Sequence, residues 1–313
     1  MARPITLGMV NVLHRNQPMQ ERRERLLHWV EEAGRRGCQI VALPEFADHH
    51  VTHEAGEAHR QSIDELRRVV GLTWDAPFIK SLRESARKHG MVVIPDVLWL
   101  EGGRPYNRCV VIGPEGERLG HYDKVHLAPE EQKTVDFGAK LEPVATPFGK
   151  LGLLVCYDIN FPEITRCYEL QGAEILIWTT MRQCESEEIL YRAVLPARAY
   201  EHKLPFAVTT YVTPNQHLNM KPMTSAVFNA LGQLVAGSMT CEGVVAGTVD
   251  LDARPLLRRA WANPQFVDAS RYFARQRHPE LYGPLTRRLG ADEANPALEP
   301  TVAEYPDFAA PKI

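Results

Sequence analysis

The strongest constraint on the fold is an early alternation of strand-like and helix-like patterns. Short apolar runs at Ile5–Val12, Ile40–Leu43 and Met91–Leu100 predict buried strands. Between them, Met19–Gly37 and Ala76–Gly90 repeat apolar residues at helical spacing, and the first of these segments ends on a glycine that suits a helix C-terminus. The order strand, helix, strand, helix, strand predicts an α/β fold in which helices cover a sheet.

The middle of the chain changes to hairpins. Glu101-Gly102-Gly103 and Gly113–Gly116 predict turns on either side of a strand at Cys109–Ile112. Further strands are expected at 151–155, 174–178, 205–212, 224–228 and 244–249, and helices after Asn160 and at 187–202, the latter divided at Pro196. Because crossovers and hairpins both occur, we expect a mixed sheet layered with helices, with two sheets face to face.

The residue composition of the chain changes after Asp252. An arginine-rich segment with aromatic residues, Arg254–Tyr282, leads into a tail punctuated by four prolines at positions 296, 300, 306 and 311. Such a tail has little periodicity of its own. We therefore expect one domain at 1–252 and an extension at 253–313 that packs on the domain or on a neighbouring subunit, or stays mobile.

Composition excludes several classes of partner. The 313 residues carry a formal net charge of −3, which gives no electrostatic preference for nucleic acid or anionic membranes. No stretch approaches eighteen apolar residues, and the N-terminus lacks a secretory pattern, so we expect a cytoplasmic protein. The six cysteines form no CxxC pairs, which favours reduced thiols over a disulfide framework or a zinc site. We expect no cofactor.

Three ionisable residues fall directly after or between the predicted strands: Glu45, Lys124 and Cys156. A scaffold can point side chains at such positions into a cleft. Taken singly, each has an ordinary alternative, because the glutamate could be solvated, the lysine could lie on the surface and the cysteine could be a small buried hydrophobe. Their sequence context decides between these readings.

The surrounding motifs resemble those of the nitrilase superfamily, also called the carbon–nitrogen hydrolase family, with its Glu-Lys-Cys triad in this order. The motifs are Leu43-Pro44-Glu45-Phe46, Tyr122-Asp123-Lys124-Val125-His126-Leu127 and Cys156-Tyr157-Asp158-Ile159-Asn160-Phe161-Pro162-Glu163, and the similarity extends from about Ile5 to Asp252. The resemblance implies an α-β-β-α sandwich, paired in a homodimer or a higher homo-oligomer.

Carried over residue by residue, the resemblance makes Glu45 the general base, Lys124 the oxyanion stabiliser and Cys156 the nucleophile. The family's second glutamate falls at Glu130 or Glu131, and we prefer Glu131 from its distance to Lys124 along the chain.

Elementary chemistry supports the same roles. A free thiol has a pKa of about 8.5, which a helix N-terminus and a nearby ammonium would lower at Cys156. Partial desolvation would raise the pKa of Glu45 toward the working pH, so that it could take the thiol proton. The backbone N–H of Tyr157 could join Lys124 in binding the developing oxyanion. Asn160 is the expected N-cap of the helix that follows.

Two groups of histidines suggest other chemistry. His49, His50, His53 and His59 crowd the segment after Glu45 and could form a metal site or border a substrate pocket, although no HExxH motif accompanies them and a solvated loop explains them as well. His126 could suggest a Cys-His peptidase, but it is part of the lysine motif. We expect no metal.

The reaction is expected to be hydrolysis of an amide or N-carbamoyl group in a small molecule. Nitrile-cleaving relatives tend to follow the cysteine with Trp-Glu, whereas this chain has Tyr157-Asp158. Carbamoylases tend to place an arginine three or four residues after the cysteine, where Ile159 and Asn160 stand here; Arg182 is a weak candidate for holding a substrate carboxylate. The alternatives are a nitrile hydrolase and a non-catalytic scaffold or sensor.

Overall fold

The computed structural model describes residues 2–181, 189–212, 224–237, 241–253, 255–258 and 265–286. Its contacts divide the chain into residues 1–270 and residues 271–313. The described part of the second unit holds the end of helix α8 (Ala269–Arg275) and two short 3-10 helices, η4 (Pro279–Leu281) and η5 (Gly283–Leu285). The division at 252/253 that the sequence suggests stays a prediction.

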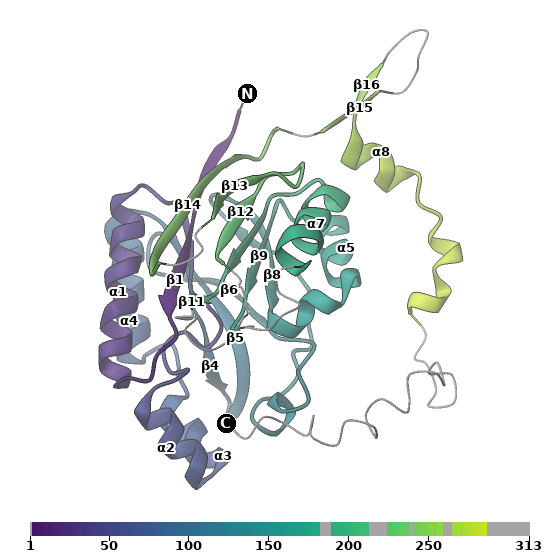
Figure 1. Ribbon diagram of the computed structural model, residues 1–313. Coiled ribbons are helices and arrows are strands. Elements are labelled where there is room, and N and C mark those ends of the chain that lie inside the picture. The colour runs from purple at the N-terminus through teal and green to yellow at the C-terminus, as the bar shows by residue number, and fades with distance from the viewer. Residues whose placement is uncertain are drawn as a thin grey trace. The chain divides into compact units, whose positions relative to one another are not determined.

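Two mixed sheets form the centre of the first unit (Figure 1). The larger sheet has the order β11-β1-β2-β3-β5-β4, with β14 paired to β1 and β6 to β5; its strands are β1 (Pro4–Leu13), β2 (Ile40–Ala42), β3 (Val92–Ile94), β4 (Asp96–Glu101), β5 (Arg104–Ile112), β6 (Arg118–Asp123), β11 (Tyr211–Val212) and β14 (Gly243–Asp250). The smaller has the order β13-β12-β10-β9-β8-β7, from β7 (Val144–Thr146), β8 (Gly149–Val155), β9 (Ile175–Thr179), β10 (Phe206–Thr209), β12 (Ala226–Phe228) and β13 (Leu234–Gly237). A two-stranded ladder joins β15 (Leu256–Arg258) to β16 (Phe266–Asp268).

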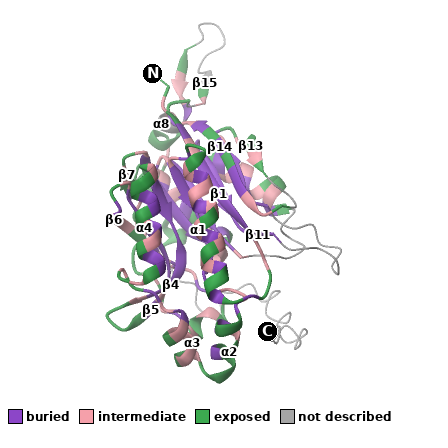
Figure 2. Cartoon of the chain, turned by 90° about the vertical axis from the view of Figure 1, so that its left-hand side faces the viewer, coloured by how far each residue is buried: buried purple, intermediate pink, exposed green. Residues whose placement is uncertain are grey.

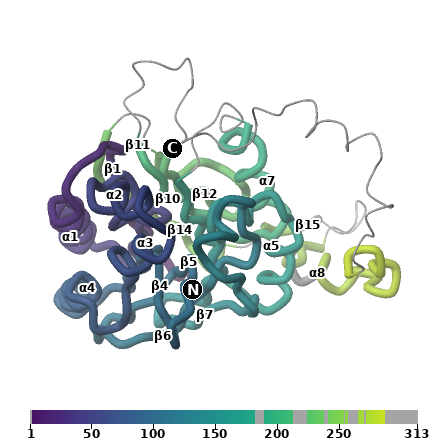
Figure 3. Tube along the Cα trace, turned by 90° about the horizontal axis from the view of Figure 1, so that it is seen from below, coloured from purple at the N-terminus to yellow at the C-terminus, as the bar shows by residue number. Residues whose placement is uncertain are grey.

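Helices cover the outer faces of the two sheets. On one side lie α1 (Met19–Arg35) and α4 (Pro77–His89), and on the other lie α5 (Pro162–Leu170) and α7 (Leu195–His202); Figure 3 shows the sheets between them. In Figure 2 the buried strands lie behind α1 and α4, whose outer faces are exposed. The predicted α-β-β-α sandwich is confirmed.

Three apolar clusters fill the spaces between these layers. Leu26 and Ile79 pack α1 and α4 on the larger sheet, Leu7 and Leu153 pack between the sheets, and other side chains pack α5 and α7 on the smaller sheet. Residues 151–155 of β8 are all apolar because both faces of the strand are buried. Leu153 faces the space between the sheets and Leu154 faces the helices. Among the described residues, no helix is long and apolar enough to cross a membrane.

Two local predictions need correction. The strand expected at Met91–Leu100 is divided into β3 and β4 at Pro95, which has no N–H to donate, although both parts keep one register on β5. The histidine-rich segment is no plain loop, because it contains α2 (His53–Gln61) and α3 (Ile63–Val70). The side chains of Thr52 and Ser62 cap these two helices.

Candidate active site

The candidate residues lie where strands of the two sheets end. Glu45 follows β2 and Lys124 follows β6, both in the larger sheet, whereas Cys156 directly follows β8 of the smaller sheet. Glu45 and Lys124 are almost completely buried, and Cys156 is half-buried. The fold thus brings together three side chains that are far apart in the sequence.

Lys124 links two carboxylates. Its Nζ lies 2.9 Å from Oε1 of Glu45 and 2.6 Å from Oε2 of Glu131, which also accepts the Ala128 N–H. Burial would lower the pKa of Lys124, but the negative charges of the surrounding carboxylates, Glu45 and Glu131, outweigh it and raise that pKa above its usual value. The ammonium is therefore permanently charged.

The structure also distinguishes the two adjacent glutamates. Glu131 begins the 3-10 helix η1 (Glu131–Lys133) and its side chain turns toward Lys124. Glu130 is exposed and pairs with Lys133. Burial and the charge of Glu45 raise the pKa of Glu131, while Lys124 opposes that shift. Only Glu131 of the two belongs to the cluster.

Glu45 is fixed in one orientation by donors from other elements. Its Oε2 accepts the Met181 N–H at 3.1 Å, and its backbone carbonyl accepts the Tyr211 hydroxyl at 2.7 Å. The next residue, Phe46, has a φ of 48°, so the chain turns sharply directly after the glutamate. The carboxylate is held by the scaffold and not by solvent.

Asn107 on β5 joins the same cluster. Its Nδ2 donates to Oε1 of Glu45 at 2.9 Å and to Oε1 of Glu131 at 3.0 Å, and its backbone carbonyl accepts the Lys124 N–H at 3.0 Å. The role of this residue was not evident from the sequence. Asn107 is followed by Arg108 in β5, so polar residues at this point gave no signal of a buried side chain.

Cys156 occupies a strained elbow. Its φ is 42°, in the left-handed region that a residue with a Cβ rarely adopts. The indole N–H of Trp178 donates to its carbonyl oxygen at 3.1 Å, and Thr180 hydrogen-bonds its thiol. The strain and these contacts present the sulfur at the end of β8.

The expected depression of the pKa of Cys156 is wrong. Burial raises this pKa, and the charge of Glu45 adds to the effect, whereas Lys124 and the Thr180 hydrogen bond only partly oppose it. The resting sulfur is a neutral thiol, so it needs a base to become a nucleophile.

The helix predicted after Asn160 is present as α5, but its cap lies one residue later than expected. Cys156 opens a 3-10 helix, η2 (Cys156–Asn160), and α5 starts at Pro162 with Phe161 in the cap position. Asn160, the predicted N-cap, instead donates to the Tyr157 carbonyl. Tyr157 stands in the first turn of η2, where an N–H has no partner within the helix, so the predicted oxyanion donor lies beside the sulfur-bearing residue.

Asp158 ties this elbow to the lysine segment. Its buried carboxylate accepts the Val155 N–H at 2.9 Å and the Tyr122 hydroxyl at 2.7 Å. It also accepts the His126 N–H at 3.1 Å and lies 3.0 Å from the Nδ1 of that ring. His126 stacks on Phe161 with 3.7 Å between ring centroids. The histidine thus pairs with an aspartate that organises the turn.

Replacing Asp158 by alanine should destabilise the fold. Asp158→Ala would leave several buried donors without an acceptor, so we expect the free energy of unfolding to fall by about 2–4 kcal/mol. Urea denaturation followed by circular dichroism measures it. The exposed Asp252→Ala is the matched control and should change stability little; equal stability of the two variants would contradict this account.

The four histidines after Glu45 divide into two that pair with other side chains and two that lie on a helix. His49 is buried and pairs with Asp48 at 2.8 Å, and His50 faces His14 with 3.0 Å between their Nε2 atoms. Burial is the main reason that the pKa of His50 falls to about 3. His53 and His59 lie on α2. Within the described ranges, no three potential metal ligands come together.

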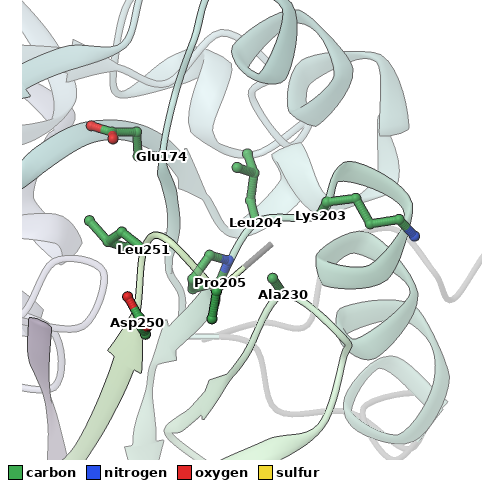
Figure 4. Close-up of a pocket in the computed structure, with 8 residues that line it drawn as sticks. Glu174, Lys203, Leu204, Pro205, Ala230, Asp250 and Leu251 are labelled. Atoms are coloured by element: carbon green, nitrogen blue, oxygen red, sulfur yellow. The ribbon is translucent and has the colours of Figure 1, made fainter. Parts of the chain in front are cut away.

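Two residues considered in the sequence lie outside the described residues. They are Arg182, the candidate for holding a substrate carboxylate, and Cys184. The small pocket in Figure 4, about 10 Å³ in volume, is lined by residues such as Glu174, Lys203 and Leu251 and by none of the candidate site residues.

The fold and the site together define an α/β sandwich with a buried carboxylate–lysine–cysteine centre. A model of the carbon–nitrogen hydrolase family matches residues 14–259, so the chain belongs to that family. A probable nitrilase of Schizosaccharomyces pombe is 29% identical over 220 residues, which cover 69% of this chain and 76% of that protein. The omega-amidase NIT2 of Danio rerio is 26% identical over 233 residues, covering 71% and 80%. The crystal structure of a carbon–nitrogen hydrolase from Helicobacter pylori G27 superimposes with a TM-score of 0.74 at 22% identity, covering 91% of this chain and 99% of that one. The predicted resemblance is confirmed, and the chain is a carbon–nitrogen hydrolase.

Proposed function

We propose that this enzyme hydrolyses a small amide or N-carbamoyl compound through a thioester on Cys156 and releases ammonia or an amine. The observation that carries the proposal is the buried Lys124 ammonium, held between the carboxylates of Glu45 and Glu131 within electrostatic reach of the Cys156 sulfur. A structural ion pair needs one acid and one base, whereas this cluster adds a second acid and a strained thiol.

The first half-reaction forms the thioester. Glu45 takes the thiol proton as the sulfur attacks the substrate carbonyl carbon, and the resulting oxyanion is bound by Lys124 and the Tyr157 N–H. When the tetrahedral intermediate collapses, the C–N bond breaks and Glu45 returns the proton to the departing nitrogen. The raised pKa of Cys156 makes this base necessary, because the resting thiol is not ionised.

The second half-reaction releases the acid. A water molecule attacks the thioester carbonyl, Glu45 or Glu131 accepts the water proton, and the C–S bond breaks with return of a proton to sulfur. The same oxyanion donors serve both halves. Glu131, with its pKa raised by burial and by Glu45, holds the lysine and is suited to assist with the water.

The amide reaction is favoured over nitrile hydrolysis by Tyr157-Asp158 after the cysteine, and the similarity to an omega-amidase supports the same choice. The similarity to a probable nitrilase keeps nitrile hydrolysis as the second candidate.

We also propose a cytoplasmic enzyme that needs no cofactor and binds no nucleic acid. We propose that it assembles as a homodimer or higher homo-oligomer, and exposed apolar side chains such as Leu231 and Leu234 support this proposal.

The test is ammonia release from a panel of primary amides, N-carbamoyl amines and nitriles, run with and without a chelator. We expect turnover of amides or N-carbamoyl compounds at a rate that the chelator leaves unchanged. Turnover of nitriles alone would favour the second candidate. A complete lack of turnover, together with no acyl adduct on Cys156 by mass spectrometry, would favour a scaffold or sensor.

A further inference from the structure

One neutral residue contacts three charged residues of the site, Glu45, Lys124 and Glu131. Asn107 donates through Nδ2 to Glu45 and to Glu131, and its carbonyl oxygen accepts the Lys124 N–H. Its side chain is fully buried. Asn107 thus bridges the same two carboxylates that Lys124 also bridges.

The orientation of the amide is set by these acids. Both amide hydrogens are directed at carboxylate oxygens, while the Oδ1 of Asn107 is buried without a hydrogen-bond partner among the described residues. A buried acceptor without a partner is unfavourable, and such an atom in a folded protein calls for an explanation. Here the explanation is that the opposite orientation would place Oδ1 against two carboxylates.

Each carboxylate accepts hydrogen bonds from a distinct set of donors. Oε1 of Glu45 accepts from both Lys124 and Asn107. In Glu131, Oε1 accepts from Asn107, and Oε2 accepts from Lys124 and the Ala128 N–H. Two carboxylates at close range tend to share a proton, because each charge disfavours the other. A double N–H donor between them opposes that sharing by stabilising both ionised forms.

We propose that Asn107 is a positioning residue that holds the carboxylates of Glu45 and Glu131 in separate hydrogen-bonded positions, so that Glu45 can accept the Cys156 proton. This inference rests on the proposed function, since it assigns the environment that the base requires. Asn107 contacts the two carboxylates and not the reacting atoms, so it acts on the reaction through Glu45 and Glu131.

Ionisable groups from several described elements act on the two acids, and a substitution at position 107 removes none of them. They are Lys124 after β6, Cys156 after β8, Asp96 on β4, Cys109 on β5 and Tyr211 on β11. A change in pH dependence between the wild type and a variant at position 107 therefore reports the loss of the amide donors.

The test is Asn107→Leu, which keeps a similar side-chain volume but removes both donors. The readout is the rate at which iodoacetamide alkylates Cys156, followed peptide by peptide with mass spectrometry from pH 4 to 10. Loss of the donors disfavours the ionised carboxylates, so the rising acid limb of the profile should move to higher pH by about one unit. At any pH below the acid limb of both proteins, turnover should fall about tenfold for the same reason.

The matched control is Asn11→Leu. Asn11 is also a buried asparagine, but it bonds Ser225 and the Cys241 carbonyl and does not contact the acids. It should cost stability without moving the acid limb. If Asn107→Leu does not fold, Asn107→Ser decides, because one short hydroxyl cannot bridge both acids and the limb should still move. An acid limb that matches the wild type in the folded position-107 variant overturns the inference.

The outcome is separable from that of the proposed function. A wild-type enzyme that turns over amides, combined with an unmoved limb in the position-107 variant, rejects the role of Asn107 and leaves the function standing. An enzyme without turnover, but with a limb that moves, rejects the function and keeps the role of Asn107 in holding the acids.

Discussion

Cys156→Ala is expected to abolish ammonia release, with a loss of at least about 10⁴-fold in kcat, because no covalent intermediate can form. No other described cysteine can replace it. Burial raises the pKa of Cys38 to about 11 and that of Cys109 well above its usual range, and Cys167 and Cys241 are exposed on the surface. The assay is ammonia release with the best substrate of the panel.

The matched control is Cys167→Ala on α5, which should retain wild-type activity because it removes an exposed thiol that has no part in the site. Circular dichroism and the melting temperature should be close to wild type for both variants. Cys156→Ala activity above about one per cent of wild type would reject the thioester mechanism.

Lys124→Ala should produce the second largest loss, because it removes both the oxyanion partner and the charge that neutralises Glu45 and Glu131. If the ammonium acts mainly on a charge that exists only during reaction, kcat and kcat/KM should fall together by about 10²–10³-fold. Initial rates across a range of substrate concentrations separate the two constants. A rise in KM at unchanged kcat would make Lys124 a ground-state binding residue.

Two further variants sharpen this test. Lys124→Arg should rescue poorly, because a planar guanidinium cannot fill the buried position of a compact ammonium. The exposed Lys80→Ala removes a positive charge that pairs with Asp75 and with none of the site residues, and it should leave both constants unchanged.

The layers of the fold could be predicted because the pattern of apolar residues repeats with the period of each element. The helices at α1 and α4 and the turns at Gly102-Gly103 and Gly116 follow directly from such signals, and these glycines do adopt positive φ angles. The helix α2 was missed because charged and histidine residues dominate its sequence and only two small side chains are buried. The helix α3 was missed although its apolar residues recur at helical spacing, because it is only 8 residues long.

The site was predictable in its members but less so in its electrostatics. Glu45, Lys124 and Cys156 could be named from their motifs, whereas the contacts of Asn107 and Asp158 depend on the way in which distant strands meet. The sign of the pKa shift at Cys156 was missed for a similar reason. It is set by desolvation and by Glu45, 111 positions away in the chain, and neither effect can be evaluated before the layers are assembled.

The nucleophile and its acid–base partners are supplied by different sheets. Cys156 ends a strand of the six-stranded sheet, while Glu45, Lys124 and Asn107 belong to the eight-stranded one, and apolar side chains such as Leu153 fill the layer between. Catalysis therefore requires the two sheets to hold these groups close together. A relative shift of the two sheets would therefore separate the sulfur from its proton acceptor even if each sheet kept its own hydrogen bonds. Catalytic activity thus depends on the position of one sheet relative to the other.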